Sequence, residues 1–141
     1  MTEGERHAAI VACQQLSVAF GNYVDQRRYA ELGALFAPDG VFERAGVGVV
    51  GPAAIEAELA KRPAHWATLH FCTNVQIEPV DADHAVGRAY QFVLMQKDVT
   101  GDPPYPMPGS IEAAGIFEDA FVRTAAGWRF ASRRTLSVFR R

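Results

Sequence analysis

The sequence predicts an α+β domain in which helices precede an antiparallel sheet. Through roughly the first 60 residues, apolar residues recur at steps of three and four, the period of amphipathic helices. Beyond that point the period changes to two, in four long stretches that are joined by turns, as expected for strands. Helices first and hairpins afterwards are typical of α+β folds with an antiparallel sheet.

Three helices are predicted in the first half of the chain. The first covers residues 5–24, and the second covers residues 28–37 and is stopped by the turn residues 38–40, Pro-Asp-Gly. The third begins with Pro52 at its first position, where a missing N–H costs nothing, and runs to about Lys61. The periodic apolar positions of the first helix are Ile10, Cys13, Leu16, Phe20 and Val24.

Six strands are predicted after or between these helices. The stretch from Gly101 to Gly109 contains four prolines, which cannot serve a central strand, so it is expected to form a loop at a rim, where it would act as a partial lid. The predicted strands cover residues 41–43, 46–50, 67–78, 84–96, 111–124 and 127–139.

Both faces of the predicted sheet carry apolar residues, and a sheet with one face in water would show a cleaner polar side. A second copy of the chain is the simplest cover, so we predict a homodimer built on the outer face. On strand 67–78 alternation places His70, Cys72 and Asn74 on one face and Leu69, Phe71, Val75 and Ile77 on the other. On the last strand Trp128, Phe130, Leu136 and Val138 share a face, opposite Phe139.

Composition limits the classes of function. A length of 141 residues predicts one domain, residues 1–141, with a sizeable core. The net charge of −2, with basic residues clustered only near the C-terminus, argues against a nucleic-acid partner, and no apolar run is long enough for a membrane span. The N-terminus is polar and unlike a signal peptide, and the two cysteines, Cys13 and Cys72, lie in a predicted helix and a predicted strand. We therefore predict a cytoplasmic protein without disulfides. No metal-binding spacing occurs, so no metal is expected.

One histidine and one distant acid form the candidate catalytic pair. His70 lies among small polar residues on a predicted strand and is a candidate base, and Asp25 ends the first helix. A carboxylate bonded to one imidazole nitrogen fixes the tautomer and raises the basicity of the other nitrogen. Two structural alternatives stay open: His70 as a core histidine bonded to Asn74 or to backbone, and Asp25 as the cap of the helix near Arg28.

The order of several short motifs resembles the SnoaL-like branch of the NTF2-like superfamily. Together these motifs span nearly the whole chain. The resemblance implies a cone of curved antiparallel sheet, closed by three N-terminal helices around a pocket. The matching stretches are residues 23–32, 35–42, 51–55, 69–74 and 127–130.

Within that group the chain looks most like the scytalone dehydratases and the lindane dehydrochlorinases, in which an acid and a histidine at the positions of Asp25 and His70 form a dyad. The dehydrochlorinases share a Thr-x-His-x-x-Thr-Asn run, reproduced here by Thr68, His70, Thr73 and Asn74. One departure is Met95, where the scytalone dehydratases carry a second histidine. The resemblance implies a lyase or isomerase of the dehydratase or dehydrohalogenase type, which needs no cofactor and takes a small hydrophobic molecule as substrate.

Other residues are candidates for binding that substrate, although each is also compatible with a plain core or surface role. Aromatic residues would supply walls, Tyr23 would donate a phenol, and an inward arginine would steady a developing anion. Arg133 and Arg134 alternate faces, so at most one points inward, and Glu118 and Asp119 are expected at the surface. The predicted substrate-binding residues are Phe20, Tyr23, Phe42, Trp66, Asn74, Met95, Phe117 and Arg133.

Two other functions remain open at this point. The same cone could serve as a non-catalytic module that binds a small ligand, with His70 and Asn74 only orienting it. It could also be a structural subunit resembling the small subunit of ring-hydroxylating dioxygenases. A chain that is active alone would exclude the structural subunit.

Overall fold

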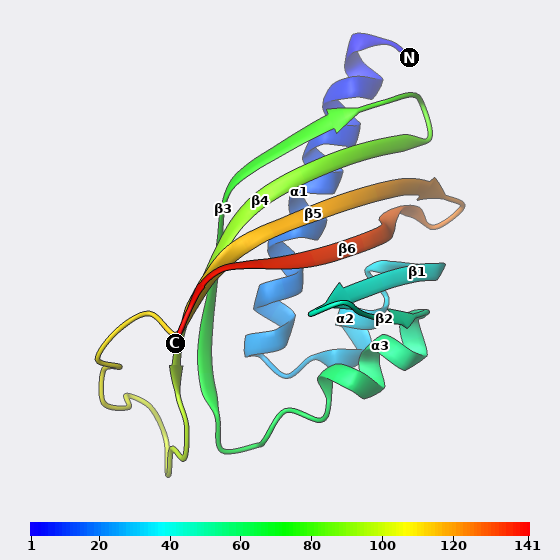
Figure 1. Cartoon of the computed structure of the whole chain (residues 1–141). Coiled ribbons are helices and arrows are strands. Elements are labelled where there is room, and N and C mark those ends of the chain that lie inside the picture. Colours follow the sequence, from blue (N-terminus) through cyan, green and yellow to red (C-terminus); the bar gives the residue numbers. More distant parts are fainter.

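Three helices pack on the concave face of one curved six-stranded sheet in this computed structural model, which describes residues 1–141 (Figure 1). The sheet order is β2-β1-β6-β5-β4-β3, and all neighbours are antiparallel except β1 and β6. The predicted α+β class is therefore confirmed. The helices are α1 (Glu3–Asp25), α2 (Tyr29–Gly33) and α3 (Pro52–Leu59), and the strands are β1 (Phe36–Arg44), β2 (Val47–Val50), β3 (Ala67–Pro79), β4 (His84–Gln96), β5 (Ala113–Thr124) and β6 (Gly127–Arg140).

The four long strands lie where the sequence predicted them, but the second helix is much shorter than predicted. It ends at Gly33, and the chain enters β1 at Phe36, so residues 38–40 lie within a strand and not in a turn. The Phe36 ring is buried against the rings of Phe42 and Phe130, and the strand pairs with β6. Burial of this aromatic ring against β6 overrides the helical period of the local sequence.

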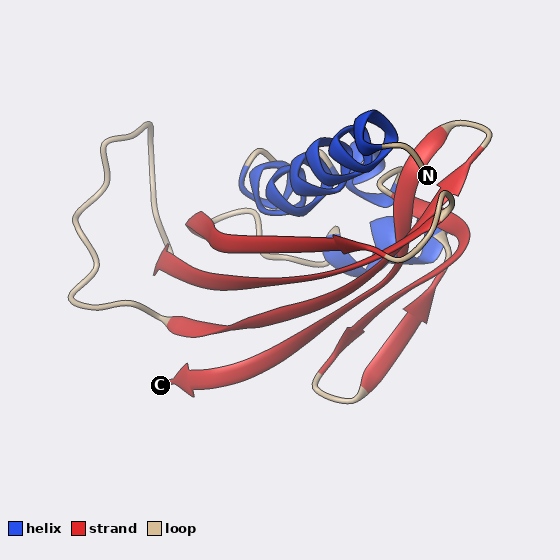
Figure 2. Cartoon of the chain, turned by 90° about the horizontal axis from the view of Figure 1, so that it is seen from above, coloured by secondary structure: helices blue, strands red, loops and turns tan.

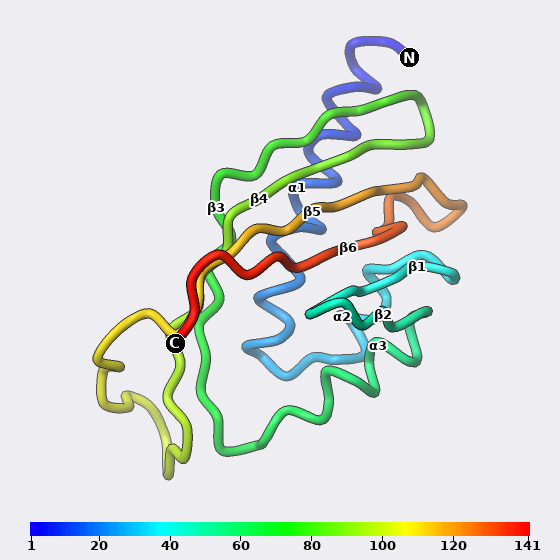
Figure 3. Tube along the Cα trace, viewed as in Figure 1, coloured from blue at the N-terminus to red at the C-terminus, as the bar shows by residue number.

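A bulge in β3 exchanges the two faces of the strand. The pairing with β4 shifts between Thr73 and Gln76, and Asn74 has a φ of 53°. Because a bulge inserts one extra residue, alternation restarts on the opposite face. Asn74 is exposed, whereas Val75 and Ile77 pack in the core, so their predicted faces are wrong. The trace in Figure 3 shows β3 turning sharply along its length.

Strand β6 is irregular in the same way. Its pairing with β5 shifts between Ala120 and Phe121, which brings Arg133 opposite the buried Asp119 and Leu136 opposite Ile116. Leu136 therefore lies on the outer face, and the prediction that it shares a face with Phe130 is wrong. The irregularity places a charged pair inside the molecule.

The core lies between α1 and the sheet. Phe20 of α1 is at its centre, with ring centroids 5.2–6.5 Å from those of the four core phenylalanines around it. Helix α1 begins with a capping box in which Thr2 and Glu5 exchange hydrogen bonds. None of the helices combines the length and apolarity that crossing a membrane requires. The rings around Phe20 are Phe36, Phe42, Phe117 and Phe130.

The Pro-rich segment lies outside the sheet, as predicted, and projects away from the body of the protein between β4 and β5 (Figure 2). Its hydrogen bonds include one from Gln96 to the carbonyl of Pro106 and one from Tyr105 to the carbonyl of Gly101. Replacing residues 102–108 by three glycines is expected to change the free energy of unfolding by no more than about 0.5 kcal/mol, because the loop is exposed. Urea unfolding measures this change, and loss of a cooperative transition would place the segment in the core.

Candidate active site

Asp25 and His70 are in direct contact, at the point where β3 crosses the end of α1. The His70 Nδ1 lies 2.6 Å from Asp25 Oδ1, and the two side chains are 22% and 12% exposed. The backbone N–H of His70 donates to Oδ2 at 2.7 Å, and the Thr68 hydroxyl donates to Oδ1 at 2.8 Å. The predicted contact is confirmed. The predicted cap is absent, because the N-cap residue of α2 is Arg28, without a side-chain hydrogen bond.

A glycine makes this contact possible. Gly21 lies one turn before Asp25 on α1, and a Cβ at that position would come within 3.0 Å of the Cβ of His70. A contact of that length is tighter than nine in ten real Cβ contacts, so a side chain at this position would require the histidine or the helix to move by a few tenths of an ångström. The absence of a side chain at Gly21 allows β3 to lie close enough for the carboxylate to reach the imidazole.

The pairing determines which imidazole nitrogen is free. An ionised carboxylate only accepts hydrogen bonds, so the Nδ1–H of His70 donates to Asp25 and the lone pair of Nε2 remains available. Thr68 in turn accepts from Arg62 Nη2 at 2.9 Å, so a guanidinium group reaches the dyad through one hydroxyl. Arg27 donates to the carbonyls of Pro63 and Trp66 and anchors the approach to β3.

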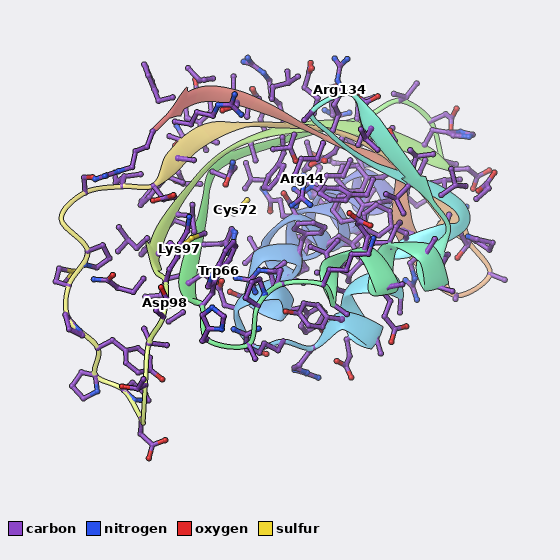
Figure 4. All side chains as sticks on the ribbon, turned by 60° about the horizontal axis from the view of Figure 1, so that its bottom comes forward. Arg44, Trp66, Cys72, Lys97, Asp98 and Arg134 are labelled. Atoms are coloured by element: carbon purple, nitrogen blue, oxygen red, sulfur yellow. The ribbon has the colours of Figure 1, made fainter.

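His70 borders an open cavity of about 1110 Å³ between the sheet and the helices. Figure 4 shows Arg44, Cys72 and Trp66 on the helix side of the sheet, whereas Arg134 lies on the other side. Of the 25 lining residues 12 are hydrophobic, and the exposed wall of the cavity is more apolar than polar, as predicted. Five of the eight predicted substrate-binding residues line this cavity: Phe20, Phe42, Trp66, Met95 and Phe117.

The other three lie outside its lining. The Tyr23 ring packs beneath the guanidinium of Arg28, at 4.9 Å, and Asn74 is exposed beyond the bulge, where its side chain accepts from Thr73. Arg133 points inward but is fully buried and bonded elsewhere. The Pro-rich loop from Gly101 to Gly109 also contributes no residue to the lining.

The cavity is rich in positive charge, although the chain as a whole has a net charge of −2. Its two carboxylates are already engaged. Glu58 accepts from Lys61 at 2.8 Å, a hydrogen bond that lowers the pKa of this carboxyl, and Glu43 lies 3.8 Å from Arg134. Three lining arginines have no carboxylate within 4.0 Å: Arg44, Arg62 and Arg140.

Sequence analysis did not identify these three arginines as site residues. They come from the end of β1, the segment after α3 and the end of β6, and no short motif joins them. Only the closure of the fold brings the three segments around one cavity.

Behind the cavity wall lies a buried ion pair that the sequence also failed to indicate. Arg133 Nε donates to Asp119 Oδ1 at 2.8 Å and Nη2 to Oδ2 at 3.0 Å, while Nη2 also donates to Ser17 Oγ at 2.6 Å. The prediction that Asp119 lies at the surface is therefore wrong, because this residue is only 6% exposed. Burial raises the pKa of its carboxyl, and the pairing with Arg133 opposes that rise. Burial, with the nearby Asp119 charge, also raises the pKa of the Cys13 thiol to about 12.

The guanidinium of Arg133 also stacks on aromatic rings. Its central carbon lies 3.7 Å from the ring centroid of Phe117, 4.6 Å from that of Phe130 and 5.0 Å from that of Phe20. The pair thus satisfies its own charges and links α1, β5 and β6. With its donors committed to Asp119 and Ser17, the guanidinium has a structural role beside the cavity.

Comparison with known proteins gives a family and a fold. A family model described as a SnoaL-like domain matches residues 5–134. Similar solved structures include a putative scytalone dehydratase from Novosphingobium aromaticivorans, which is 20% identical, with 98% of this chain and 89% of that chain covered and a TM-score of 0.80. A type 2 hexachlorocyclohexane dehydrochlorinase is 19% identical, with 98% and 90% covered and a TM-score of 0.81.

A third similar structure, ActVI-ORFA from Streptomyces coelicolor, is 20% identical, with 92% of this chain and 96% of that chain covered and a TM-score of 0.72. No curated protein sequence gives a significant match. Identities this low establish a shared fold and leave the reaction to be argued from the site.

Proposed function

Since the chain belongs to the SnoaL-like family of the NTF2-like superfamily, we propose that it is an enzyme that removes a proton from carbon in a small substrate. The observation that carries this proposal is the 2.6 Å contact between Asp25 and His70 at the wall of the cavity. Nε2 of His70 is the base, and Asp25 holds the ring in the correct tautomer and stabilises the imidazolium that forms.

In the proposed reaction the C–H bond breaks and its proton moves to Nε2 of His70. The electron pair of that bond forms a carbon–carbon double bond as a leaving group departs from the neighbouring carbon with its own pair. Water, assisted by a proton, or a halide ion is the leaving group. In the isomerase variant nothing leaves, and the proton returns to a different carbon. The reaction needs no cofactor, because a positioned base and a group that stabilises the anion suffice for proton abstraction.

Two of the similar structures support an elimination as the reaction class. One is named a putative scytalone dehydratase and the other a dehydrochlorinase, so their names describe loss of water and of hydrogen chloride. The direct tests are incorporation of deuterium from D2O into ketones and formation of an alkene with release of chloride from β-chlorinated rings, both followed by NMR. Failure of the purified protein to react with any of them, combined with tight binding of one, would favour the non-catalytic ligand-binding module.

The cavity lining supports a substrate that combines an apolar body with one anionic group. Hydrophobic residues make up 12 of the 25 lining residues, enough to hold a compact ring. Arg44 and Arg140 have no carboxylate partner, whereas the guanidinium of Arg62 already donates to Val24, Tyr29 and Thr68. A hydrogen bond between charged groups contributes more than one between neutral groups. A carboxylate or phenolate on the substrate would supply the missing partner.

Two ring ketones that differ only in charge test this substrate class. We expect 4-oxocyclohexanecarboxylate to exchange its α-hydrogens at least about tenfold faster than the corresponding carboxamide, because only the carboxylate pairs with the arginines. Arg44→Gln and Arg140→Gln should each reduce this preference, whereas Arg123→Gln, which changes a cation paired with Asp83 on the surface, should not. Equal rates for the two ketones, with exchange still dependent on His70, would reject the anionic substrate but retain the base.

A further inference from the structure

The guanidinium of Arg62 reaches three parts of the chain that meet around Asp25. Its Nη1 donates to the backbone carbonyl of Val24 at 3.1 Å and to the Tyr29 hydroxyl at 3.4 Å, and its Nη2 donates to the Thr68 hydroxyl at 2.9 Å. Arg62 itself belongs to the segment between α3 and β3, which passes the end of α1 (Figure 1). One side chain therefore ties together the end of α1, the start of α2 and the start of β3.

The end of α1 is a place where a cation is favourable. The last carbonyls of a helix have no partners within it, and the aligned peptide dipoles make this end negative. The last turn of α1 contains no basic residue, and its final residue is Asp25, whose carboxylate lies at the end that disfavours negative charge. Arg62 supplies positive charge from outside the helix, at the carbonyl of the residue just before Asp25.

The hydrogen bonds from Arg62 to Asp25 have only one possible direction. A guanidinium group only donates and an ionised carboxylate only accepts, so the single proton of the Thr68 hydroxyl points to Asp25. Oδ1 of this carboxylate then accepts from Thr68 at 2.8 Å and from Nδ1–H of His70 at 2.6 Å. A hydroxyl that accepts a charged hydrogen bond is polarised and donates more strongly. The carboxylate is thus held by a chain of hydrogen bonds that begins at Arg62.

We propose that Arg62 is a positioning residue, which holds the Asp25 carboxylate against Nδ1 of His70 through one intervening hydroxyl. This inference rests on the proposed function, in which Nε2 of His70 removes the proton. Arg62 acts in this role through the dyad and not on the substrate, although it lines the cavity. Its contribution is geometric, because a base that is slightly displaced or turned no longer meets the C–H bond in a reactive orientation.

Two ketones separate this role from direct binding of an anion. Arg62→Gln should slow deuterium exchange of 4-oxocyclohexanecarboxylate and of its neutral carboxamide by the same factor, about tenfold, with little change in KM. Arg44→Gln should slow only the carboxylate. Arg28→Gln is the matched control and should leave both rates unchanged, because Arg28 is exposed and pairs with Glu31. An effect of Arg62→Gln on the carboxylate alone would overturn the proposal.

A pair of variants at residue 68 tests the hydroxyl link. Thr68→Val keeps the shape and removes the hydroxyl, so it should slow exchange of the neutral ketone about as much as Arg62→Gln does. Thr68→Ser retains the hydroxyl and should keep most of the rate. In the Asp25→Asn background Arg62→Gln should cause little further loss, because it acts through that carboxylate. Equal losses in Thr68→Val and Thr68→Ser, or losses that multiply in the Asp25→Asn background, would contradict the proposal.

A measurement without turnover keeps this inference separate from the proposed function. In folded protein labelled with 15N at histidine, the proton resonance of Nδ1–H of His70 reports on its hydrogen bond to Asp25. Arg62→Gln and Thr68→Val should both shift this resonance, and Arg28→Gln should not. If the unmodified protein exchanges no ketone but the resonance shifts as expected, the positioning role is upheld and the proposed reaction alone fails. A resonance that stays unchanged in both variants would overturn the positioning role.

Discussion

His70→Ala is expected to slow proton removal from carbon by about 10²–10⁴-fold, the usual effect of losing a positioned general base. The variant should remain folded, because the backbone N–H of residue 70 and the Thr68 hydroxyl still donate to Asp25. The measurement is the rate of deuterium incorporation into the same ketone by the variant and by the unmodified protein. His65→Ala is the matched control, because His65 is 55% exposed and pairs with the surface residue Asp98.

Asp25→Asn tests the second member of the dyad. An amide has nearly the same shape but no charge, so it neither stabilises the imidazolium nor holds His70 in the tautomer with Nε2 free. We expect a decrease in rate with the fold retained. A folded Asp25→Asn variant that turns over at the unmodified rate would reduce Asp25 to a structural anchor of β3. Full turnover by His70→Ala would place the chemistry elsewhere.

Asp119→Ala is expected to destabilise the protein by about 3–5 kcal/mol, although Asp119 is not part of the proposed chemistry. The substitution leaves the fully buried Arg133 without its counter-ion, and an uncompensated charge in the interior is costly. The free energy of unfolding in urea measures the loss. Glu118→Gln removes the exposed partner of Arg134 instead and should have a much smaller effect.

A double variant separates charge from packing at this position. Replacing Arg133 by Met and Asp119 by Leu removes both charges and fills the same space with apolar atoms. Such exchanges of buried pairs are often neutral or stabilising, so the double variant should recover most of the stability that Asp119→Ala loses. A small effect of Asp119→Ala alone, under about 1 kcal/mol, would contradict the inference that the buried Arg133 needs its counter-ion.

Much of the fold could be predicted because each long strand carries its own period and its own turns. The contact between Asp25 and His70 was predictable only because the surrounding motifs resemble a known family. The bulge at Asn74 and the irregularity in β6 were not predictable from alternation, since one inserted residue reverses every face that follows. For that reason Asn74 was expected in the site. Asp119 was expected at the surface because charged side chains are usually solvated, although the regular alternation of β5 places it on the same face as Phe117 and Phe121.

The positive charge of the cavity could not be predicted from the sequence for a different reason. Arg44, Arg62 and Arg140 are far apart in the chain, and an isolated arginine is most often a solvated surface residue. Their convergence depends on how β1, the segment after α3 and the end of β6 close around the same space, which no local pattern describes.

The fixed direction of His70 has a stereochemical consequence. Nδ1 is committed to Asp25, and the close approach of Gly21 holds the ring against α1, so a proton can be taken only from the side of the substrate that faces β3. The two hydrogens of a methylene group, chemically identical in solution, are then distinguished by position alone. The orientation of the substrate in the cavity therefore determines which hydrogen is lost and the handedness of any product.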